Sequence, residues 1–177
     1  MWTLLESPVG DLRVVADGTS ILAIDFVGAP EDSTQRPSPA SSITRSAVRA
    51  EGRPVGDRAD AHPLLRRCGA ELEAYFAGDL KEFDLPLRPH GTPFQLSVWE
   101  QLRGIGYGET ATYGEVARRL GMTTAASRAV GLANGRNPVP IVIPCHRVVG
   151  ADGSLTGYAG GVGRKRLLLD LERGALF

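Results

Sequence analysis

Residues 112–134 read TYGEVARRLGMTTAASRAVGLAN, and this stretch decides the fold that we expect for the second half of the chain. Thr112 is a favourable helix N-cap, and Glu115 stands three residues later in the capping-box position, so a short helix is predicted over residues 113–120. The glycine that follows ends this helix, and a second helix is predicted over about residues 124–134. Two short helices joined by a glycine-containing turn are typical of a helix-turn-helix.

The charge of this region differs from that of the whole chain. The 177 residues hold 20 basic and 20 acidic side chains, so the formal net charge is zero. Between residues 118 and 147, however, five arginines occur without any aspartate or glutamate: Arg118, Arg119, Arg128, Arg136 and Arg147. Such a segment predicts a local basic surface that suits a phosphate backbone, the alternative being an ordinary solvated face. The second helix is also rich in alanine and glycine, which allow a close approach to another surface.

A cysteine closes this basic segment. Residues 141–143 (IVI) are predicted to form a buried strand that ends at a proline, and Cys145, His146 and Arg147 follow directly. A thiol needs a nearby base or positive charge to react at neutral pH, and these two neighbours supply both kinds of group. Because adjacent residues of an extended chain point to opposite faces, contact between Cys145 and His146 requires a turn or a bridging water. The alternative is a buried cysteine beside a structural histidine.

The first half of the chain predicts a small antiparallel sheet and one helix. Strands are expected over residues 3–7, 12–16 and 21–26, and a helix is expected from Leu64 to about Gly78. Cys68 lies on the apolar stripe of that helix and is interpreted as a small buried hydrophobic residue. Residues from about 29 to 62 are poor in apolar side chains and predict a flexible surface loop. We expect an α/β (α+β) protein with domains at residues 1–89 and 90–177, the second beginning with a helix over 94–102.

Composition excludes several classes of protein. No apolar run approaches the roughly 18 residues that a membrane helix needs. The two cysteines and the three histidines (His62, His90 and His146) cannot build a disulfide framework or a zinc cluster. We therefore expect a soluble, cytoplasmic chain without a metal or another cofactor.

The motifs around the cysteine resemble those of a known family. The sequence PCHRV at 144–148, preceded by NGRNP at 134–138 and followed by GYAGG at 157–161, closely resembles the O6-alkylguanine-DNA alkyltransferases. The resemblance runs from about Thr92 to Glu172, and the first half is similar only in its hairpin opening and in YFAG at 75–78. It implies a ribonuclease H-like N-terminal domain and a C-terminal domain of winged helix-turn-helix type.

The resemblance also implies a function. Such a protein transfers the alkyl group of O6-alkylguanine in double-stranded DNA to its own Cys145, irreversibly and once per molecule, with O4-alkylthymine as a second candidate substrate. The helix-turn-helix is expected to enter the minor groove of the DNA while the damaged nucleotide is flipped out. His146 is implied as the base that acts through water, Glu172 as the carboxylate that orients His146, and Tyr113 as the donor to the guanine. Arg128 is implied as the side chain that fills the vacated base stack. We expect a monomer and no membrane partner.

Further residues receive substrate-binding or DNA-binding roles by the same resemblance. Asn137 is expected to hold the turn before the cysteine, and the carbonyl of Val148 to read the exocyclic amine of the base. The remaining expected contacts are Arg147, Tyr158, Ala159 and Gly160. At Ala159 some relatives have serine, but the implied contact there uses the backbone N–H. The turn between Tyr113 and Arg128 is one residue longer than in some relatives, which affects the expected register on DNA.

Two alternative functions fit these residues less well. Alkyltransferase-like proteins recognise the lesion without repairing it, but they lack the acceptor cysteine that is present here as Cys145. An unrelated cysteine-histidine hydrolase requires an oxyanion hole and multiple turnovers. Such a hydrolase also leaves the arginine segment and the helix-turn-helix unexplained.

Overall fold

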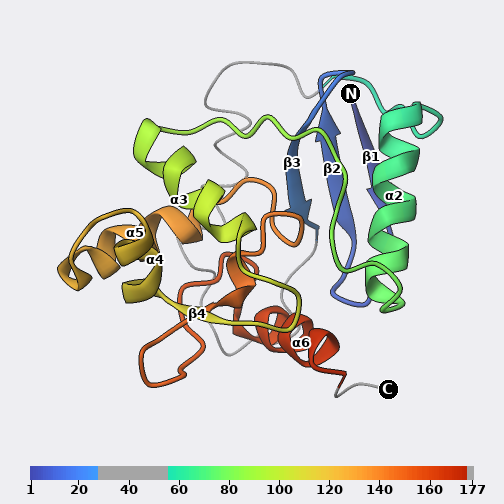
Figure 1. Ribbon diagram of the computed structural model, residues 1–177. Coiled ribbons are helices and arrows are strands. Elements are labelled where there is room, and N and C mark those ends of the chain that lie inside the picture. The colour runs from blue at the N-terminus through green and yellow to red at the C-terminus, as the bar shows by residue number, and fades with distance from the viewer. Residues whose placement is uncertain (28–55, 175–177) are drawn as a thin grey trace.

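The computed structural model describes residues 1–27 and 56–174 and shows a mixed α/β protein (Figure 1). Strands β1 (Trp2–Leu5), β2 (Leu12–Ala16) and β3 (Ile21–Phe26) form an antiparallel sheet in the order β1-β2-β3. Helix α2 (Pro63–Phe76) packs against this sheet. The predicted sheet and helix are therefore confirmed, with boundaries that differ by one or two residues.

The burial pattern explains why this segment forms a helix on a sheet. Pro63 stands in the first turn of α2, where its missing N–H is not needed. The buried side chains of α2 recur every three or four residues and include Cys68, which is fully buried as predicted. Gly69 permits close packing, because a Cβ atom there would lie 3.3 Å from the side chain of Leu5.

Both edges of the sheet are covered by other parts of the chain. At β1, the Trp2 amide donates to the Asp57 carbonyl (3.1 Å), and the Ala59 amide donates to the Trp2 carbonyl (2.8 Å). At β3, the Ile24 amide donates to the Pro138 carbonyl (2.8 Å), which ties the sheet to the second half. Most of the loop predicted at 29–62 lies outside the described residues. Its last part is not a free loop, because residues 57–59 pair with β1.

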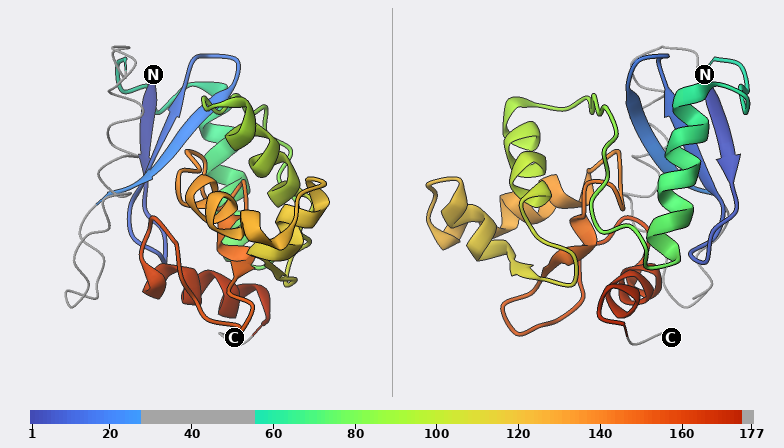
Figure 2. Two further views of the ribbon diagram at one scale, coloured as in Figure 1. Left: turned by 90° about the vertical axis from the view of Figure 1, so that its left-hand side faces the viewer. Right: turned by 45° about the vertical axis from the view of Figure 1, so that its right-hand side comes forward.

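The second half of the chain is mainly helical. Its elements, in chain order, are α3 (Pro93–Arg103), β4 (Ala111–Thr112), α4 (Tyr113–Arg119), η1 (Thr124–Ala126), α5 (Ser127–Gly135), η2 (Cys145–Arg147), β5 (Val148–Val149) and α6 (Val162–Glu172). The predicted capping box of α4 is present, with Thr112 and Glu115 each bonded to the other's backbone amide. Helices α4 and α5 lie at the end of the molecule opposite the sheet (Figures 1 and 2). Among the described residues, no helix has the length and apolar character needed to cross a membrane.

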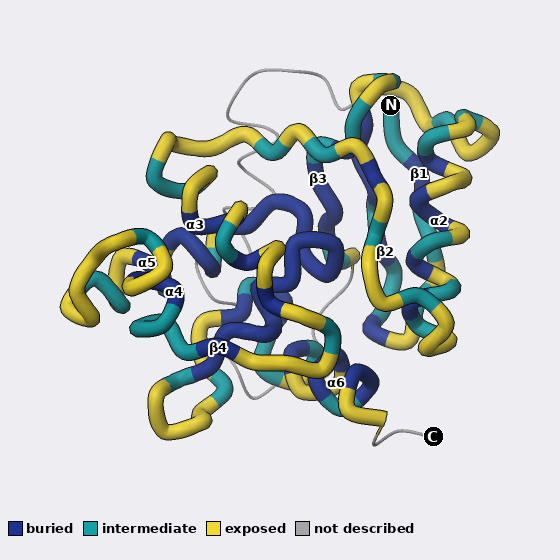
Figure 3. The backbone as a smooth tube through the Cα atoms, in the orientation of Figure 1, coloured by how far each residue is buried: buried dark blue, intermediate teal, exposed yellow. Residues whose placement is uncertain are grey.

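The prediction of a strand at residues 141–143 is wrong. These residues form a turn, in which Ile141 has a φ of 74°. Residues 137–149 are all buried and run through the centre of the molecule (Figure 3). The apolar run indicated burial correctly, but Pro138, Pro140 and Pro144 lack the amide hydrogens that a strand ladder needs. A parallel pairing of β4 with β5 closes this central segment on its C-terminal side.

Candidate active site

The turn before Cys145 is held by Asn137. The Asn137 side chain donates from Nδ2 to the Ile143 carbonyl (2.8 Å) and accepts at Oδ1 from the Val139 amide (3.0 Å). A β-branched residue with positive φ, such as Ile141, costs about 1–3 kcal/mol of backbone strain. The strained turn persists because Ile141 is fully buried and Asn137 bridges its two arms. Asn137 thus lies where its implied role requires it.

The cysteine itself begins a short 3-10 turn, Cys145–Arg147, instead of continuing a strand. The sequence required such a turn, or a bridging water, if the two neighbouring side chains were to cooperate. The Cys145 amide donates to the Ile143 carbonyl (2.8 Å), and Asn134 of α5 donates from Nδ2 to the Cys145 carbonyl (3.3 Å). The second helix of the helix-turn-helix is therefore hydrogen-bonded directly to the backbone of Cys145.

Glu172, near the end of α6, is the centre of a buried polar network. Its Oε1 atom accepts from His146 Nε2 (2.7 Å), Tyr75 Oη (2.7 Å) and Arg147 Nη2 (3.0 Å). Its Oε2 atom accepts from Arg147 Nε (2.9 Å) and from the Gly108 amide (3.0 Å). Burial acts to raise the pKa of Glu172, but the hydrogen bonds of His146 and Arg147, the charge of Arg147 and the charge that His146 acquires when it is protonated at low pH outweigh it and lower the pKa to about 2. Glu172 is therefore ionised at neutral pH.

This network fixes the tautomer of His146. Since an ionised carboxylate only accepts hydrogen bonds, the Nε2 atom that faces Glu172 must carry a proton. Burial lowers the pKa of His146, so the ring is neutral at pH 7 and the lone pair resides on Nδ1. The Nδ1 atom is buried and has no hydrogen-bond partner among the described residues. It is the atom of His146 that can accept a proton.

The thiol of Cys145 is protected in the resting protein. The side chain is buried, and burial raises the pKa of this thiol to about 11, although the Asn137 side chain and the charge of Lys165 act in the opposite direction. At pH 7 the thiol is therefore protonated. Cys145 therefore needs a proton acceptor at the moment of reaction. Burial raises the pKa of Cys68 further, to about 12, and the charge of Glu71 adds to the effect.

Lys165 is a site residue that our sequence reasoning missed. Its side chain is fully buried, and Nζ donates to the carbonyls of Val148 (2.6 Å) and Thr156 (2.7 Å). The Tyr113 hydroxyl donates to the same Thr156 carbonyl (2.8 Å), and Nζ lies 5.9 Å from the centre of the Tyr113 ring. Burial lowers the pKa of Lys165 to about 8. One signal was available: Lys165 is one of only two lysines in an arginine-rich chain.

Tyr158 and two glycines form a tightly packed wall beside the thiol. A Cβ atom at Gly160 would lie 2.7 Å from the Tyr158 ring and 2.8 Å from that of Phe26, so only glycine fits there. At Gly157, where φ is +67°, a Cβ atom would lie 2.8 Å from the Tyr113 hydroxyl oxygen. Ala159 lies between these positions and is half-buried. The Tyr158 hydroxyl is buried without a hydrogen-bond partner among the described residues.

The basic surface of the helix-turn-helix consists of four arginines. Arg118, Arg119, Arg128 and Arg136 are exposed, and none forms an ion pair with another described residue. The sequence had placed Arg147 on this surface too, but Arg147 is buried against Glu172 and donates to the Ile105 carbonyl (2.5 Å). Four unpaired cations at one end of a neutral protein form a surface that suits a polyanion.

The small residues of α5 lie on two faces of the helix, one toward the site and one toward solvent. A Cβ atom at Gly131 would lie 3.7 Å from the Tyr113 ring, and one at Gly135 would lie 3.7 Å from the Gly157 carbonyl oxygen. These two glycines therefore face the site. Ala129, beside Arg128, is exposed. The alanine and glycine pattern thus reflects close packing on the site as well as a smooth outer surface.

The helix-turn-helix carries an exposed basic surface, and its second helix is hydrogen-bonded to the backbone of Cys145, a buried cysteine followed by a histidine that a carboxylate holds. These features define the class of DNA-binding proteins with a candidate reactive cysteine. The sequence model described as "6-O-methylguanine DNA methyltransferase, DNA binding domain" matches residues 93–174, and its companion "ribonuclease-like domain" matches residues 1–89. The chain belongs to the 6-O-methylguanine DNA methyltransferase family. The family indicated by the sequence motifs is confirmed.

Relatives and solved structures support this membership along the whole chain. A methylated-DNA–protein-cysteine methyltransferase of Methanosarcina acetivorans is 43% identical over 171 residues, which cover 97% of both chains. One from Mycobacterium tuberculosis is 60% identical over 103 residues, which cover 58% of this chain and 62% of the relative. The crystal structure of the M. tuberculosis O6-methylguanine methyltransferase matches with a TM-score of 0.77 at 41% identity, covering 99% of this chain and 94% of that one. The M. tuberculosis OGT in complex with DNA matches with a TM-score of 0.76 at 39% identity, covering 98% and 93%.

Proposed function

We propose that this protein repairs DNA by transferring an alkyl group from O6 of guanine to its own Cys145, once per molecule. The observation that carries the proposal is a buried thiol followed in the chain by His146, whose ring is held by Glu172 and whose buried Nδ1 atom has no hydrogen-bond partner among the described residues. The exposed arginines of the helix-turn-helix supply the DNA-binding surface in the same half of the chain. Two free cysteines suit a reducing compartment, so we place this activity in the cytoplasm.

The first step is removal of the thiol proton. His146 takes this proton at Nδ1 through an intervening water, and Glu172 stabilises the imidazolium that forms. Lys165 lies close enough to lower the pKa of Cys145, so its charge stabilises the thiolate. Arg147, which the sequence had assigned to substrate contact, acts instead by clamping both oxygens of Glu172.

The second step moves the alkyl group. The sulfur–carbon bond forms as the carbon–O6 bond breaks, and the bonding electron pair goes to the guanine. Burial raises the pKa of Tyr113, so its hydroxyl proton is present at neutral pH. In the resting protein this proton is donated to the Thr156 carbonyl, and during the reaction the hydroxyl turns from that carbonyl to donate to the base. The product is a thioether, and no described residue is placed to cleave it, so each molecule reacts once.

The remaining site residues bind the substrate. The carbonyl of Val148, the backbone N–H of Ala159 and the walls formed by Tyr158 and Gly160 receive the flipped base. Arg128 projects from the exposed side of α5 and fills the gap that the base leaves in the duplex. Asn137 keeps the turn before Cys145 in place.

The test is a count of transferred groups. The protein is incubated with excess duplex DNA that carries O6-methylguanine, and the intact mass and the peptide map are then measured. We expect one methyl group per molecule, on Cys145 and not on Cys68. More than one turnover per molecule, or a label on Cys68, overturns the proposal.

A further inference from the structure

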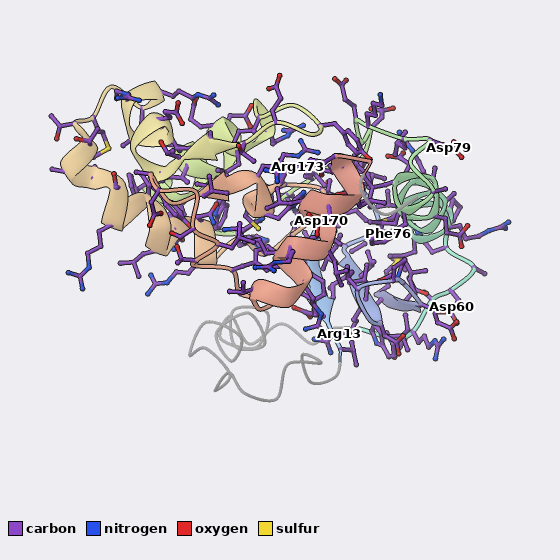
Figure 4. The ribbon with its side chains drawn as sticks, turned by 90° about the horizontal axis from the view of Figure 1, so that it is seen from below. Arg13, Asp60, Phe76, Asp79, Asp170 and Arg173 are labelled. Carbon is purple, nitrogen blue, oxygen red and sulfur yellow. The ribbon has the colours of Figure 1, made fainter. Side chains whose placement is uncertain are left out.

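The N-terminal half of the chain contributes one hydroxyl group to the buried network around Glu172. Tyr75 lies in the last turn of α2 and is fully buried. Its hydroxyl donates to Glu172 Oε1 (2.7 Å) across a sequence separation of 97 residues. The end of α2 meets α6 in Figures 1 and 2, and Figure 4 shows Phe76, the last residue of α2, beside this helix.

The same carboxylate oxygen also accepts the hydrogen bond from His146 Nε2, again at 2.7 Å. With Arg147 Nη2 at 3.0 Å, three donors share this one atom. An oxygen that gives part of its negative charge to one donor is a weaker acceptor for the next. The phenol of Tyr75 therefore competes directly with the imidazole of His146.

We propose that Tyr75 is a positioning residue for alkyl transfer. By donating a hydrogen bond to Glu172 Oε1, it limits how strongly Glu172 stabilises the doubly protonated imidazolium form of His146. A histidine that acts as base must be neutral before the reaction, and too strong a carboxylate partner would keep it protonated. The inference rests on the proposed function, because it gives His146 the role of the base. It also makes thiol activation depend on the correct docking of the N-terminal half.

The phenol has to be the donor in this contact. Burial raises the pKa of Tyr75 far above its usual range, and the negative charge of Glu172 adds to this effect. Glu172 is ionised and can only accept. The rings of Phe76 and Phe83 lie with their centres 5.3 Å from the Tyr75 ring and hold it in place.

Several other charged or titratable groups surround His146, and they come from the second half of the chain. Arg147 and Lys165 lower the pKa of His146, whereas Glu172 raises it. Tyr158 interacts electrostatically with Cys145, Arg164 and Glu172. Tyr107 interacts in the same way with Glu172 and Arg147. A change confined to the Tyr75 hydroxyl leaves all of these groups in place.

The first experiment is the pH profile of alkyl transfer for Tyr75→Phe. Loss of the phenol should leave Glu172 a stronger partner for the imidazolium, so the pKa of His146 should rise. We expect the acid limb of the single-turnover rate to move upward by roughly half a pH unit to one unit, with the plateau at higher pH retained. The control is Tyr107→Phe, because the Tyr107 ring packs 6.0 Å from that of Tyr75 and its phenol feels the charges of Glu172 and Arg147, but its hydroxyl forms no hydrogen bond to Glu172 or to another described residue. This control should not move the limb.

A second measurement is independent of activity. The chain has only three histidines, so the ring nitrogens of His146 can be followed by 15N NMR after assignment with a His146→Asn variant. In the unmodified protein we expect a neutral ring with the proton on Nε2, and in folded Tyr75→Phe a ring that titrates at higher pH. An unchanged titration and tautomer in the folded variant overturns the inference. If the protein transfers no alkyl group, the proposed function fails, while this measurement still tests the hydrogen bond.

A third variant covers the case in which Tyr75→Phe does not fold. Incorporation of 3-fluorotyrosine at position 75 keeps the shape of the ring and makes the phenol a stronger donor. The pKa of His146 should then fall, opposite to the effect of phenylalanine. A His146 titration that does not respond to the fluorinated phenol overturns the inference.

Discussion

The buried turn of residues 137–149 and the exposed pair of helices α4 and α5 are joined to each other, yet they use their charged groups in opposite ways. In the turn, His146 and Arg147 are buried and share a single carboxylate. On the helices, Arg118, Arg119 and Arg128 are exposed and form no ion pair with a described residue. The charges of the buried turn are paired inside the protein, whereas those of the two helices are exposed and can bind a partner.

This difference follows from the dielectric environment. In a buried site the hydrogen bonds and charges are strong enough to shift pKa values by several units, so they can set the protonation state of a nucleophile and its base. On an exposed surface the same charges are screened by salt, and they act on a polyanion mainly by releasing its counterions. The chemistry should therefore be sensitive to single buried groups, and DNA binding should be spread over several arginines.

The largest effect is expected for Cys145→Ser, which should abolish alkyl transfer and leave DNA binding intact. A serine hydroxyl is far less acidic than a thiol and a poor nucleophile toward an alkyl carbon, so alkyl transfer should be lost. Binding to duplex DNA should remain, because the exposed arginines are untouched. Transfer is measured by intact mass and binding by fluorescence anisotropy. The matched control is Cys68→Ser, which should still transfer; loss of DNA binding in Cys145→Ser would show that the regions are not separable.

Glu172→Gln should damage the buried region next most severely. It leaves Arg147 buried without its charged partner, so we expect a loss of about 3–5 kcal/mol in the free energy of unfolding and a transfer rate at least roughly a hundredfold lower. The control is Asp170→Asn, on the same helix and half-buried (Figure 4). Urea denaturation and single-turnover kinetics measure the two effects. Equal behaviour of the two variants would contradict a central role for Glu172.

Because the pKa of Glu172 is lowered in the folded protein, we expect the free energy of unfolding to depend on pH. The pKa of Glu172 is lowered from 4.5 to about 2 in the folded protein, so the unfolded chain binds the proton more tightly. Its contribution of about 3 kcal/mol should be fully present above pH 4.5 and should disappear as the pH falls toward 2. Denaturation curves across this range should show that loss in the unmodified protein and a smaller one in Glu172→Gln.

Lys165→Met tests the buried cation alone. Without this charge the pKa of Cys145 should rise further, and we expect transfer to slow by about tenfold or more. Lys81→Met, which changes the chain's other lysine at an exposed position, is the matched control. Single-turnover rates at saturating DNA separate this effect from binding. A Lys165→Met protein that reacts at the normal rate would show that the thiolate needs no cation here.

Arg128→Ala tests whether the exposed helices assist the chemistry of the buried site by filling the base stack of the duplex. If Arg128 fills the base stack, repair in duplex DNA should slow by about tenfold, while reaction with the free base O6-methylguanine should hardly change. Both rates are measured by mass spectrometry under single-turnover conditions. Equal slowing of the two substrates would assign Arg128 to the fold or to the site, and not to the handling of the duplex.

The smallest effects are expected for single phosphate contacts. Arg118→Ala or Arg119→Ala should weaken DNA binding by a few-fold, without sequence preference, and should reduce the slope of log affinity against log salt by about one. Transfer at saturating DNA should be unaffected. Titrations at several salt concentrations measure this slope, and an unchanged slope would remove that arginine from the DNA-binding surface.

Local patterns explain which features could be predicted. The capping box at Thr112 and Glu115, the helical stripe around Cys68 and the PCHRV motif each depend on neighbours a few residues apart, and the sequence displays them directly. The strand expected at 141–143 failed for the same reason. An apolar run shows that a segment is buried, but it does not show the positive φ of Ile141 or the bridge made by Asn137.

The sequence by itself determined the family and the helix-turn-helix, and it singled out Cys145 as the proposed acceptor, because each of these depends on residues that lie close together along the chain. Only the tertiary structure decided that Arg147 is buried on Glu172, that Lys165 stands near the thiol, and that Tyr75 reaches the same carboxylate from the other half. These contacts join residues between 17 and 97 positions apart. No local pattern encodes them, since they arise only when α2, α6 and the central turn pack into one buried site.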